Sequence, residues 1–406
     1  MKAFILAAGK GTRMRPLTVN KPKPMLPVGG KTILQHLVDN IEDKVDEIII
    51  LVGWKSEEIK ENIVSKGTKI SYVRQTELLG TADAIDHAKK HVEDEFICMN
   101  GDVIIPKDTL HDFIDFFSES DSPIIGMSRV EDPESYGVLM TEGEDVVDLI
   151  EKPDEPESDF INAGLYGFDK RIFEVIEDTE KSSRGEYEIT DSLKKLIERE
   201  GLKGFEISKD EWHELSRPWE LISTNEKIME DELKKNIEGD VEENVHFEGT
   251  VHISKNATVR EGAYIIGPVF IGEGAEIGPN CYIRPATHIG ENCKVGAASE
   301  VKNSIIMKGT NVPHHNYIGD SVIGEDCNFG SGTKVANLRL DGKEIPVIHR
   351  EEKVRSGRRK LGVIMGDEVK TGINSMIDPG TVIWGNSFIG PGAVAKGEID
   401  QGSKIQ

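Results

Sequence analysis

The chain has 406 residues, 37% of them hydrophobic and 30% charged, which is the composition of a soluble globular protein and the length of two domains. Its formal net charge of -24 argues against general binding to nucleic acid, because an acidic surface repels phosphates. The four cysteines form no Cys-x-x-Cys pair and no apolar run approaches the length of a membrane span, so we expect a cytoplasmic protein without a zinc site, disulfide framework or membrane segment.

A glycine-rich turn follows the first apolar segment, an expected strand over Lys2–Ala7. Gly9 and Gly11 accept positive φ and carry no Cβ, so such a turn brings backbone N–H groups close to a ligand. Its spacing matches neither the dinucleotide fingerprint nor the P-loop pattern. Basic side chains then concentrate at Arg13, Arg15, Lys21 and Lys23. The combination favours a triphosphate ligand, although the turn alone would also suit a purely structural role.

The longer string Leu-Ala-Ala-Gly-Lys-Gly-Thr-Arg-Met and the later Lys-Pro-Lys-Pro-Met-Leu-Pro closely resemble the signature of the sugar-1-phosphate nucleotidylyltransferases. The resemblance implies that a sugar 1-phosphate attacks the α-phosphorus of a nucleoside triphosphate and that pyrophosphate leaves. It implies that Arg13 and Lys23 act in catalysis by neutralising charge together with Mg²⁺. It also implies a nucleotide-binding set: Leu6, Ala8, Gly9, Gly11 and Thr12.

Strands and helices alternate after this motif. We expect strands at 47–53 and about 69–74, and helices at about 31–42 and 56–65. This order predicts an open, mostly parallel α/β sheet, in which ligands gather at the carboxyl ends of the strands.

One motif follows the strand at 69–74 and opens a helix expected over Ala82–His91. Such a helix N-terminus would favour an anionic or carbonyl-bearing ligand. In the resembled family the matching Gln, Gly and Thr hold the nucleobase, which implies this role for Gln75, Gly80 and Thr81. The alternative is an amide and a helix cap without a ligand. Uridine and thymidine are both compatible with these residues.

A buried strand from Phe96 ends in Asp102. An unpaired carboxylate at such a strand end is costly unless it meets a cation, and Mg²⁺ on nucleotide phosphates is the expected one. The Gly-Asp motif of the resembled family coincides, which makes Asp102 the first expected metal ligand and a structural N-cap the alternative. Relatives commonly carry a second metal-binding Asp where this chain has Glu214, so the geometry of that ligand stays open.

Three later motifs resemble the wall of the sugar-phosphate site in the same family. Gly137 would allow close approach of the sugar, Glu151 and Asn162 would bind its hydroxyls, and Lys152 would neutralise its phosphate. Each could be an ordinary loop residue when taken singly. Their order along the chain is what favours a site.

The character of the chain changes after a polar, helix-favouring stretch from about 219 to 235, because an apolar residue then recurs every six positions. A strict period of six predicts short parallel strands stacked in a β-helix, and three hexapeptides make one triangular coil in the left-handed form. The expected inward positions are Ile253, Val259, Ile265, Ile271, Ile277, Ile283, Ile289, Val295, Val301 and Met307, then Tyr317, Ile323, Phe329 and Val335, then Met365, Thr371, Ile377, Ile383 and Ile389.

The repeat is interrupted at 311–320, where the sequence resembles the acetyltransferase half of the bacterial bifunctional enzyme that makes UDP-N-acetylglucosamine, and archaeal nucleotidylyltransferases with a fused acetyltransferase domain. The resemblance places the family's basic histidine on His314. Imidazole suits this task because the amine of a hexosamine phosphate must lose a proton to attack acetyl-CoA. A lone exposed histidine usually has no such role, and His315 is expected to have none. The implied substrate-binding residues are Arg284, Lys302, Tyr317, Asn328, Asn337 and, as a looser match, Lys343.

A second interruption, 338–361, is longer than the corresponding bacterial loop and is rich in basic residues such as His349 and Arg358. One interpretation is a solvated hairpin. The other is that some of the cations in this segment, among them Arg358, Arg359 and Lys360, meet the phosphates of coenzyme A, between neighbouring subunits.

The sequence thus predicts an α/β nucleotidylyltransferase domain with a Rossmann-like mixed sheet at residues 1–238 and a left-handed β-helix acetyltransferase domain at 245–406, which in such families usually forms a trimer. The expected enzyme acetylates glucosamine 1-phosphate, or its galactosamine epimer, and transfers a uridylyl group from UTP. The alternatives are a pyrophosphorylase of the UDP- or dTDP-glucose type with a non-catalytic β-helix, and a sensor or scaffold without turnover.

Overall fold

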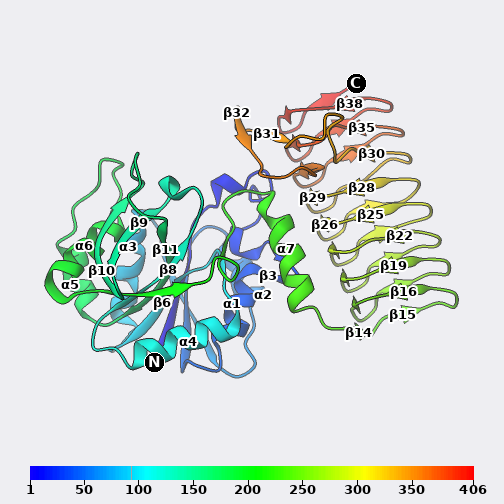
Figure 1. The fold of residues 1–406 in the computed structure, drawn as a ribbon. Coiled ribbons are helices and arrows are strands. Elements are labelled where there is room, and N and C mark those ends of the chain that lie inside the picture. Colours follow the sequence, from blue (N-terminus) through cyan, green and yellow to red (C-terminus); the bar gives the residue numbers. More distant parts are fainter. Residues whose placement is uncertain (93) are drawn as a thin grey trace. The chain divides into compact units, whose positions relative to one another are not determined.

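The computed structural model describes residues 1–92 and 94–406. Contacts divide the chain into two compact units, which Figure 1 shows coloured along the sequence. The first unit comprises Met1–Lys10, Pro22–Met25 and Ile33–Glu214, and the second comprises Gly11–Lys21, Leu26–Thr32 and Leu215–Gln406. The segment after the glycine-rich turn therefore belongs, by its contacts, with the C-terminal half of the chain.

A nine-stranded sheet forms the centre of the first unit, in the order β5-β4-β1-β6-β11-β8-β12-β10-β9. The first four strands in this order pair in parallel, whereas β11 is antiparallel to both of its neighbours, β6 and β8. The sheet is thus mixed, which confirms the predicted fold class. Its strands are β1 (Lys2–Ala7), β4 (Glu47–Val52), β5 (Lys69–Arg74), β6 (Phe96–Asn100), β8 (Ile124–Arg129), β9 (Gly137–Glu142), β10 (Asp145–Glu151), β11 (Phe160–Phe168) and β12 (Lys203–Ile207).

Helices cover both faces of this sheet because side chains alternate along each strand. Ile5 and Ile50 pack with α1 and α4 in one hydrophobic cluster, while Phe4 and Leu51 pack with α3, α5 and α6 in the other. The helix expected over 82–91 is an α-helix only as far as Asp86 and continues as a 3-10 turn over His87–Lys90. The helices are α1 (Ile33–Ile41), α2 (Ser56–Asn62), α3 (Thr81–Asp86), α4 (Lys107–Ser118), α5 (Arg171–Glu177) and α6 (Ile189–Glu200).

Two short strands at the carboxyl side of β6 complete this unit. β7 (Val103–Ile104) pairs antiparallel with β13 (His213–Glu214). Short 3-10 helices lie at Thr12–Met14, Lys23–Met25 and Pro133–Ser135.

A left-handed parallel β-helix forms most of the second unit, as predicted from the hexapeptide repeat (Figure 1). Its strands stack into three faces. The first face contains β14 (Asn236–Ile237), β17 (Val251–Ile253), β20 (Val269–Ile271), β23 (Thr287–Ile289), β26 (Ile305–Ile306), β29 (Val322–Ile323), β33 (Val363–Met365), β36 (Thr381–Ile383) and β39 (Glu398–Ile399). The second contains β15 (Asp240–Val241), β18 (Thr258–Val259), β21 (Glu276–Ile277), β24 (Lys294–Val295), β27 (Asn311–Val312), β34 (Lys370–Thr371), β37 (Phe388–Ile389) and β40 (Lys404–Ile405). The third contains β16 (His246–Glu248), β19 (Tyr264–Ile266), β22 (Tyr282–Ile283), β25 (Glu300–Lys302), β28 (Tyr317–Gly319), β30 (Lys334–Val335), β35 (Met376–Ile377) and β38 (Val394–Ala395).

The frame of the repeat differs from the prediction at two positions. Ile289 pairs with Ile306, and Val301 pairs with Ile318, so these isoleucines enter the core. Met307 and Tyr317, the expected inward residues, therefore do not hold those positions. The inward positions advance by five residues instead of six from Val301 to Ile306 and again from Ile318 to Ile323, and the strand pairing shows both shifts of the frame.

Helix α7 (Glu220–Asp231) packs within the second unit, together with the hairpin of β2 (Pro27–Val28) and β3 (Lys31–Thr32). The side chain of Asn225, on α7, contacts both the hairpin and the β-helix. Its Oδ1 atom accepts from the Gly29 amide at 2.9 Å, and its Nδ2 atom donates to the Ala286 carbonyl at 2.9 Å. The insertion at 338–361 forms a second hairpin, β31 (Pro346–His349) with β32 (Glu352–Arg355). Within the described residues, no helix has the length and apolar character needed to cross a membrane.

Candidate active sites

Lys23 and Asp102 meet in the first unit. Lys23 lies in the short helix Lys23–Met25, where Pro22 and Pro24 on either side of it restrict the backbone, and Asp102 follows β6. The ammonium of Lys23 is 2.5 Å from Oδ2 of Asp102, and the Lys23 side chain is nearly buried. The structure thus pairs an expected catalytic residue with an expected metal ligand, which the sequence analysis singled out separately.

Glu214 lies on β13, which pairs with β7, the strand that begins directly after Asp102. In the β7–β13 pair, Glu214 is opposite Val103, the residue directly after Asp102. Carboxylate oxygens are the hard donors that Mg²⁺ prefers, and one or two of them with substrate phosphates are its usual protein site. Among the described residues, no cluster of three or more metal-binding side chains occurs. The donor set therefore fits a metal that arrives with its nucleotide.

The three expected nucleobase residues all make contacts inside the protein. The Nε2 group of Gln75 donates to Asp83 at 2.8 Å, and the Thr81 hydroxyl accepts from the amide of Ile189 at 3.0 Å. Gly80 has φ of 123°, and a Cβ there would lie 2.3 Å from the carbonyl oxygen of Tyr187. These contacts fix the shape of the loop that follows β5.

The expected sugar-phosphate residues converge at the β9–β10 pair. Gly137 is opposite Glu151 in this pair, and a Cβ on Gly137 would lie 3.3 Å from Oε2 of Glu151 and 3.7 Å from Cβ of Asn162. Lys152 has φ of 46° and brings its ammonium to 3.4 Å from Glu151. The lack of a side chain at Gly137 therefore keeps open the space that Glu151 and Asn162 border.

Two further residues border this space and were not identified from the sequence. The Arg184 guanidinium is 3.1 Å from Oε1 of Glu151 and 3.0 Å from Glu188. The Cγ2 atom of Thr190 would be 3.1 Å from a Cβ at Gly137. Thr190 lies in the first turn of α6, so its place beside Gly137 depends on the packing of that helix.

The glycine-rich turn divides between the two units. Ala8 is buried, and Gly9 has open space where a Cβ would stand. Leu6 belongs to β1, between Leu51 and Asn100. Gly11 has φ of 57° and starts the short helix that carries Thr12 and Arg13, both exposed, in the second unit.

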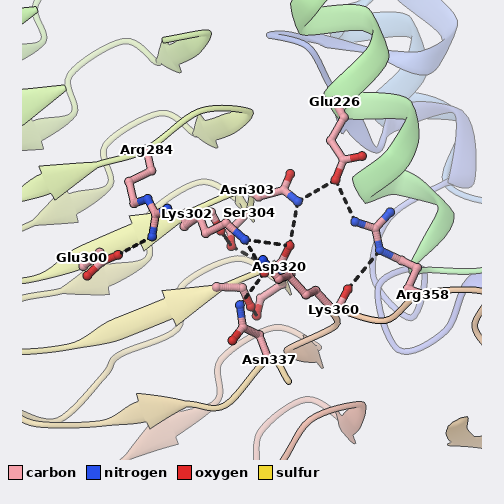
Figure 2. A network of polar contacts seen from close by, with 12 residues as sticks. Glu226, Arg284, Glu300, Lys302, Asn303, Ser304, Asp320, Asn337, Arg358 and Lys360 are labelled. Atoms are coloured by element: carbon pink, nitrogen blue, oxygen red, sulfur yellow. Dashed lines mark hydrogen bonds and ion pairs between the residues drawn. The ribbon is translucent and has the colours of Figure 1, made fainter. Parts of the chain in front are cut away.

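A polar network occupies one corner of the β-helix (Figure 2), where the buried carboxylate of Asp320 is the centre. The Lys302 ammonium is 3.0 Å from Oδ2, Asn303 Nδ2 donates to Oδ1 at 2.8 Å, and Asn337 Nδ2 donates to Oδ2 at 2.5 Å. Three donors compensate a carboxylate whose burial would otherwise be costly. Asp320 ends the interruption at 311–320, and the sequence analysis did not identify it as the common partner of these residues.

Arg284 and Tyr317 lie on the third face next to this network. Arg284 is 2.9 Å from Glu300, whose hydrogen bond raises the pKa of the guanidinium despite partial burial. Glu300 in turn is opposite Tyr317 in the β25–β28 pair. Burial, helped by the charges of Glu300 and Asp320, raises the pKa of the Tyr317 hydroxyl. The hydroxyl stays protonated at neutral pH and is available as a donor.

The other expected acetyltransferase residues are distributed around the coil. His314 is exposed in the turn that leads into β28, and its neighbour His315 has φ of 54°. Asn328 bridges Asn311 and Lys370 on the second face, and Lys343 is exposed in the insertion. The structure therefore gathers Arg284, Lys302, Tyr317 and Asn337, whereas Asn328 and Lys343 lie elsewhere on the coil.

The basic insertion is only in part a solvated hairpin. His349 is buried, and the Arg358 guanidinium is 2.7 Å from Glu226 of α7 (Figure 2). Glu226 also accepts a hydrogen bond from Asn303 at 2.5 Å, which links α7 to the Asp320 network. Arg359 remains exposed and donates to the carbonyl of Gly342.

Comparison with known proteins identifies both parts of the chain. A family model described as nucleotidyl transferase matches residues 2–231, and one described as the GMPPB C-terminal domain matches 265–370. A solved structure of UDP-glucose pyrophosphorylase with UDP-glucose has a TM-score of 0.51 at 23% identity and covers 55% of this chain and 96% of its own, which shows the fold. The first part of the chain is thus a member of the nucleotidyl transferase family.

Several relatives match over the full length, and two of them illustrate the similarity. The bifunctional protein GlmU of Methanocaldococcus jannaschii is 45% identical over 406 residues, covering 100% of this chain and 97% of the relative. The bifunctional sugar-1-phosphate nucleotidylyltransferase/acetyltransferase of Sulfurisphaera tokodaii is 39% identical over 405 residues, covering 99% of each. The chain therefore belongs to the family of bifunctional GlmU proteins, and the resemblance inferred from its motifs is confirmed.

Proposed function

We propose that the chain catalyses two steps on one amino-sugar phosphate: N-acetylation of glucosamine 1-phosphate by acetyl-CoA, then uridylyl transfer from UTP to N-acetylglucosamine 1-phosphate. We assign uridylyl transfer to residues 1–238 and acetyl transfer to 245–406. The observation that carries this proposal is that each part has its own group of polar side chains, one around the Lys23–Asp102 pair and one around the Lys302–Asp320 pair. Membership of a bifunctional family supports the same assignment.

Uridylyl transfer needs no protein base, because the attacking phosphate is already ionised. Lys23 and Arg13 neutralise the charge that develops on the triphosphate, and backbone N–H groups around Gly9 and Gly11 bind its oxygens. The nucleobase is bound by Gln75, Gly80 and Thr81. The nucleotide also contacts Leu6, Ala8 and Thr12. In the free protein, Lys23 compensates the charge of Asp102.

The carboxylates of Asp102 and Glu214 would hold Mg²⁺ with the phosphates of the nucleotide. The metal supplies further charge neutralisation when it is bound. The Lys23 ammonium, which lies against Asp102, is then available to the phosphates.

The sugar phosphate binds along the β9–β10 pair. Glu151 and Asn162 accept and donate hydrogen bonds at the sugar hydroxyls, in the space that Gly137 leaves open. Lys152 neutralises the sugar phosphate, and its position beside Glu151 supports this role.

Acetyl transfer uses His314 as the base that takes a proton from the amine as it attacks the thioester of acetyl-CoA. Arg284 and Lys302 bind the phosphate of the hexosamine, and the Tyr317 hydroxyl and the Asn337 amide orient the sugar. Lys302 is held in place by Asp320, so its ammonium needs little reorganisation to meet the phosphate.

The distribution of the remaining residues favours a homotrimer. Asn328 is on the second face and Tyr317 on the third, and side chains on different faces of one prism point away from each other. Asn328 and Lys343 of one copy would therefore complete the site on a neighbouring copy. Light scattering on the purified chain tests the trimer, which a monomeric mass would contradict.

The decisive experiment measures coenzyme A release from acetyl-CoA with glucosamine 1-phosphate and galactosamine 1-phosphate, and pyrophosphate release with UTP and dTTP. We expect His314→Ala to lose coenzyme A release and to keep pyrophosphate release. The exposed His315→Ala is the matched control. If the wild type releases pyrophosphate but no coenzyme A with either sugar, the β-helix is a scaffold and the chain is a pyrophosphorylase alone.

A further inference from the structure

The segment between the two catalytic cations of the first site is fastened to the β-helix at three points. The carbonyl oxygen of Arg15 lies 2.6 Å from Nε2 of His349. Asn20 donates to Oδ2 of Asp367 at 3.1 Å, and the Lys21 ammonium is 2.9 Å from Glu325. All of these residues belong to the second unit. Exposed Arg13 precedes this segment and Lys23 follows it.

His349 is built to donate to this carbonyl. A carbonyl only accepts, so Nε2 carries the proton, while Nδ1 faces the donating guanidinium of Arg217 at 3.4 Å and is the acceptor. The ring is buried against the edge of Trp219, with centroids 5.9 Å apart. Its neighbours therefore select one neutral tautomer, which directs a single N–H at Arg15.

The tip of the inserted hairpin fixes the position of His349. Arg350 and Glu351 both have positive φ, 56° and 67°, a conformation that costs free energy in residues with side chains. The carboxylate of Glu398 compensates, because it accepts both of their backbone amides at 2.9 Å and the indole N–H of Trp384 at 2.8 Å. A plain solvated hairpin would need neither this cap nor a buried histidine.

Asp367 holds the other end of the segment. It is nearly buried, burial raises its pKa, and its second oxygen accepts the amide of Glu325 at 2.9 Å. Glu325, oriented in this way, pairs with Lys21. A Cβ on Gly366 would lie 3.1 Å from Cβ of Pro16, so the backbone of the coil also touches the segment.

The fastening points and the acetyltransferase network are on opposite sides of one short strand. Asp320 precedes β29 (Val322–Ile323), and Glu325 follows it. The contacts with Arg15, Asn20 and Lys21 are therefore separate from the Lys302–Asp320 pair, and variants can address one set without removing a member of the other.

We propose that His349, Glu325 and Asp367 are positioning residues for nucleotidyl transfer. The β-helix then serves the first reaction as well as the second, because it holds the chain that carries Arg13 toward its working position. In this proposal the inserted hairpin holds His349 in position to donate to Arg15, and His349 does not bind coenzyme A. The inference rests on the proposed nucleotidyl transfer, because it assigns a role in that reaction.

The test uses full-length variants and two separate assays. His349→Leu removes the donor to Arg15, and His349→Gln retains an N–H at a similar reach. We expect His349→Leu to lower the kcat of pyrophosphate release about tenfold, since misplacing a catalytic group by a small distance has effects of this size or larger. We expect unchanged kinetics of coenzyme A release, substantial rescue by His349→Gln, and no effect of the exposed control Glu352→Gln.

Trypsin cleavage after Arg13, which is exposed and followed by Met14, provides a readout that does not depend on activity. In His349→Leu and in Asp367→Asn we expect cleavage of this bond to accelerate about fivefold or more, because local opening controls proteolysis. Glu368→Gln, next to Asp367 and exposed, is the control. Unchanged cleavage rates would overturn the proposal, as would equal losses of both activities with a lowered melting temperature. If the wild type releases no pyrophosphate, the proposed function is contradicted instead. The cleavage rates then still test whether His349 and Asp367 hold the segment around Arg15 to the β-helix.

Discussion

The ammonium of Lys302 lies 3.0 Å from the carboxylate of Asp320, which is almost inaccessible to solvent, at a corner of the β-helix. A buried ion pair of this kind is sensitive to the loss of one partner, because the remaining charge is left without compensation. Lys302 is thus held by the protein before any substrate arrives. The proposed role of Lys302 in acetyl transfer therefore depends on Asp320 as much as on the charge of Lys302 itself.

Replacement of Asp320 tests this dependence. In Asp320→Asn we expect the KM for glucosamine 1-phosphate to rise about tenfold, because the Lys302 ammonium loses its anchor. Coenzyme A release measures the effect. Pyrophosphate release should be unaffected, and Asp326→Asn, an exposed neighbour, should leave both activities unchanged. An unchanged KM in Asp320→Asn would show that Lys302 does not need this partner.

Neutralising Lys23 should affect only the first reaction. We expect Lys23→Met to reduce the kcat of pyrophosphate release about 100-fold or more, because a preorganised charge at the reacting phosphates is lost. Coenzyme A release is the internal control, since acetyl transfer is assigned to the other unit. Lys31→Met, which changes an exposed lysine, is the matched variant. Equal losses of both activities would contradict separate sites.

Removal of divalent metal should distinguish the two reactions in the same way. With EDTA in excess we expect pyrophosphate release to stop, because in the proposed mechanism Mg²⁺ held by Asp102, Glu214 and the nucleotide phosphates neutralises the charge of the phosphates. Coenzyme A release should continue. Added Mg²⁺ should restore the first activity in the wild type and weakly in Glu214→Gln. Full activity of Glu214→Gln at low Mg²⁺ would exclude Glu214 as a ligand.

Two glycines of the first unit should respond differently to a methyl group. Gly80→Ala should destabilise the protein by about 2 kcal/mol or more, because its positive φ and its contact with Tyr187 leave no room for a Cβ. Gly9→Ala should leave the free energy of unfolding nearly unchanged, since no atom lies within 4 Å of the added carbon. Urea unfolding measures both. Similar losses in the two variants would contradict the prediction.

The stability of the first unit should depend on Glu47 in a pH-dependent manner. Hydrogen bonds from Lys69, Ser71 and Lys2 lower the pKa of this carboxyl from 4.5 to about 2. A lowered pKa stabilises the folded state above the ordinary value, and the stabilisation is lost as the pH falls through the folded value. We expect Glu47→Gln to cost about 1 kcal/mol at pH 7. The difference from wild type in thermal unfolding should shrink between pH 5 and pH 2, whereas Glu61→Gln should show none at either pH.

The sequence alone carried the local features of this protein. Periodicity of six depends only on which side chains enter a narrow prism, and the motifs around Gly9, Asp102 and His314 consist of neighbours in the chain. These features predicted the mixed α/β sheet, the β-helix and the family. The sequence pattern did not predict the frame shift at Ile306. Both Ile306 and Met307 are apolar, and only strand pairing shows which of them occupies the inward position.

Tertiary structure decided which polar groups meet. Arg15 and His349 are more than 300 positions apart, and neither lies in a pattern that predicts the other. Asp320 becomes the centre of a network because successive coils stack Lys302, Asn303 and Asn337 around it. Contacts of this kind depend on how coils and insertions pack, and a hydrogen bond between distant segments leaves no period or spacing in the sequence.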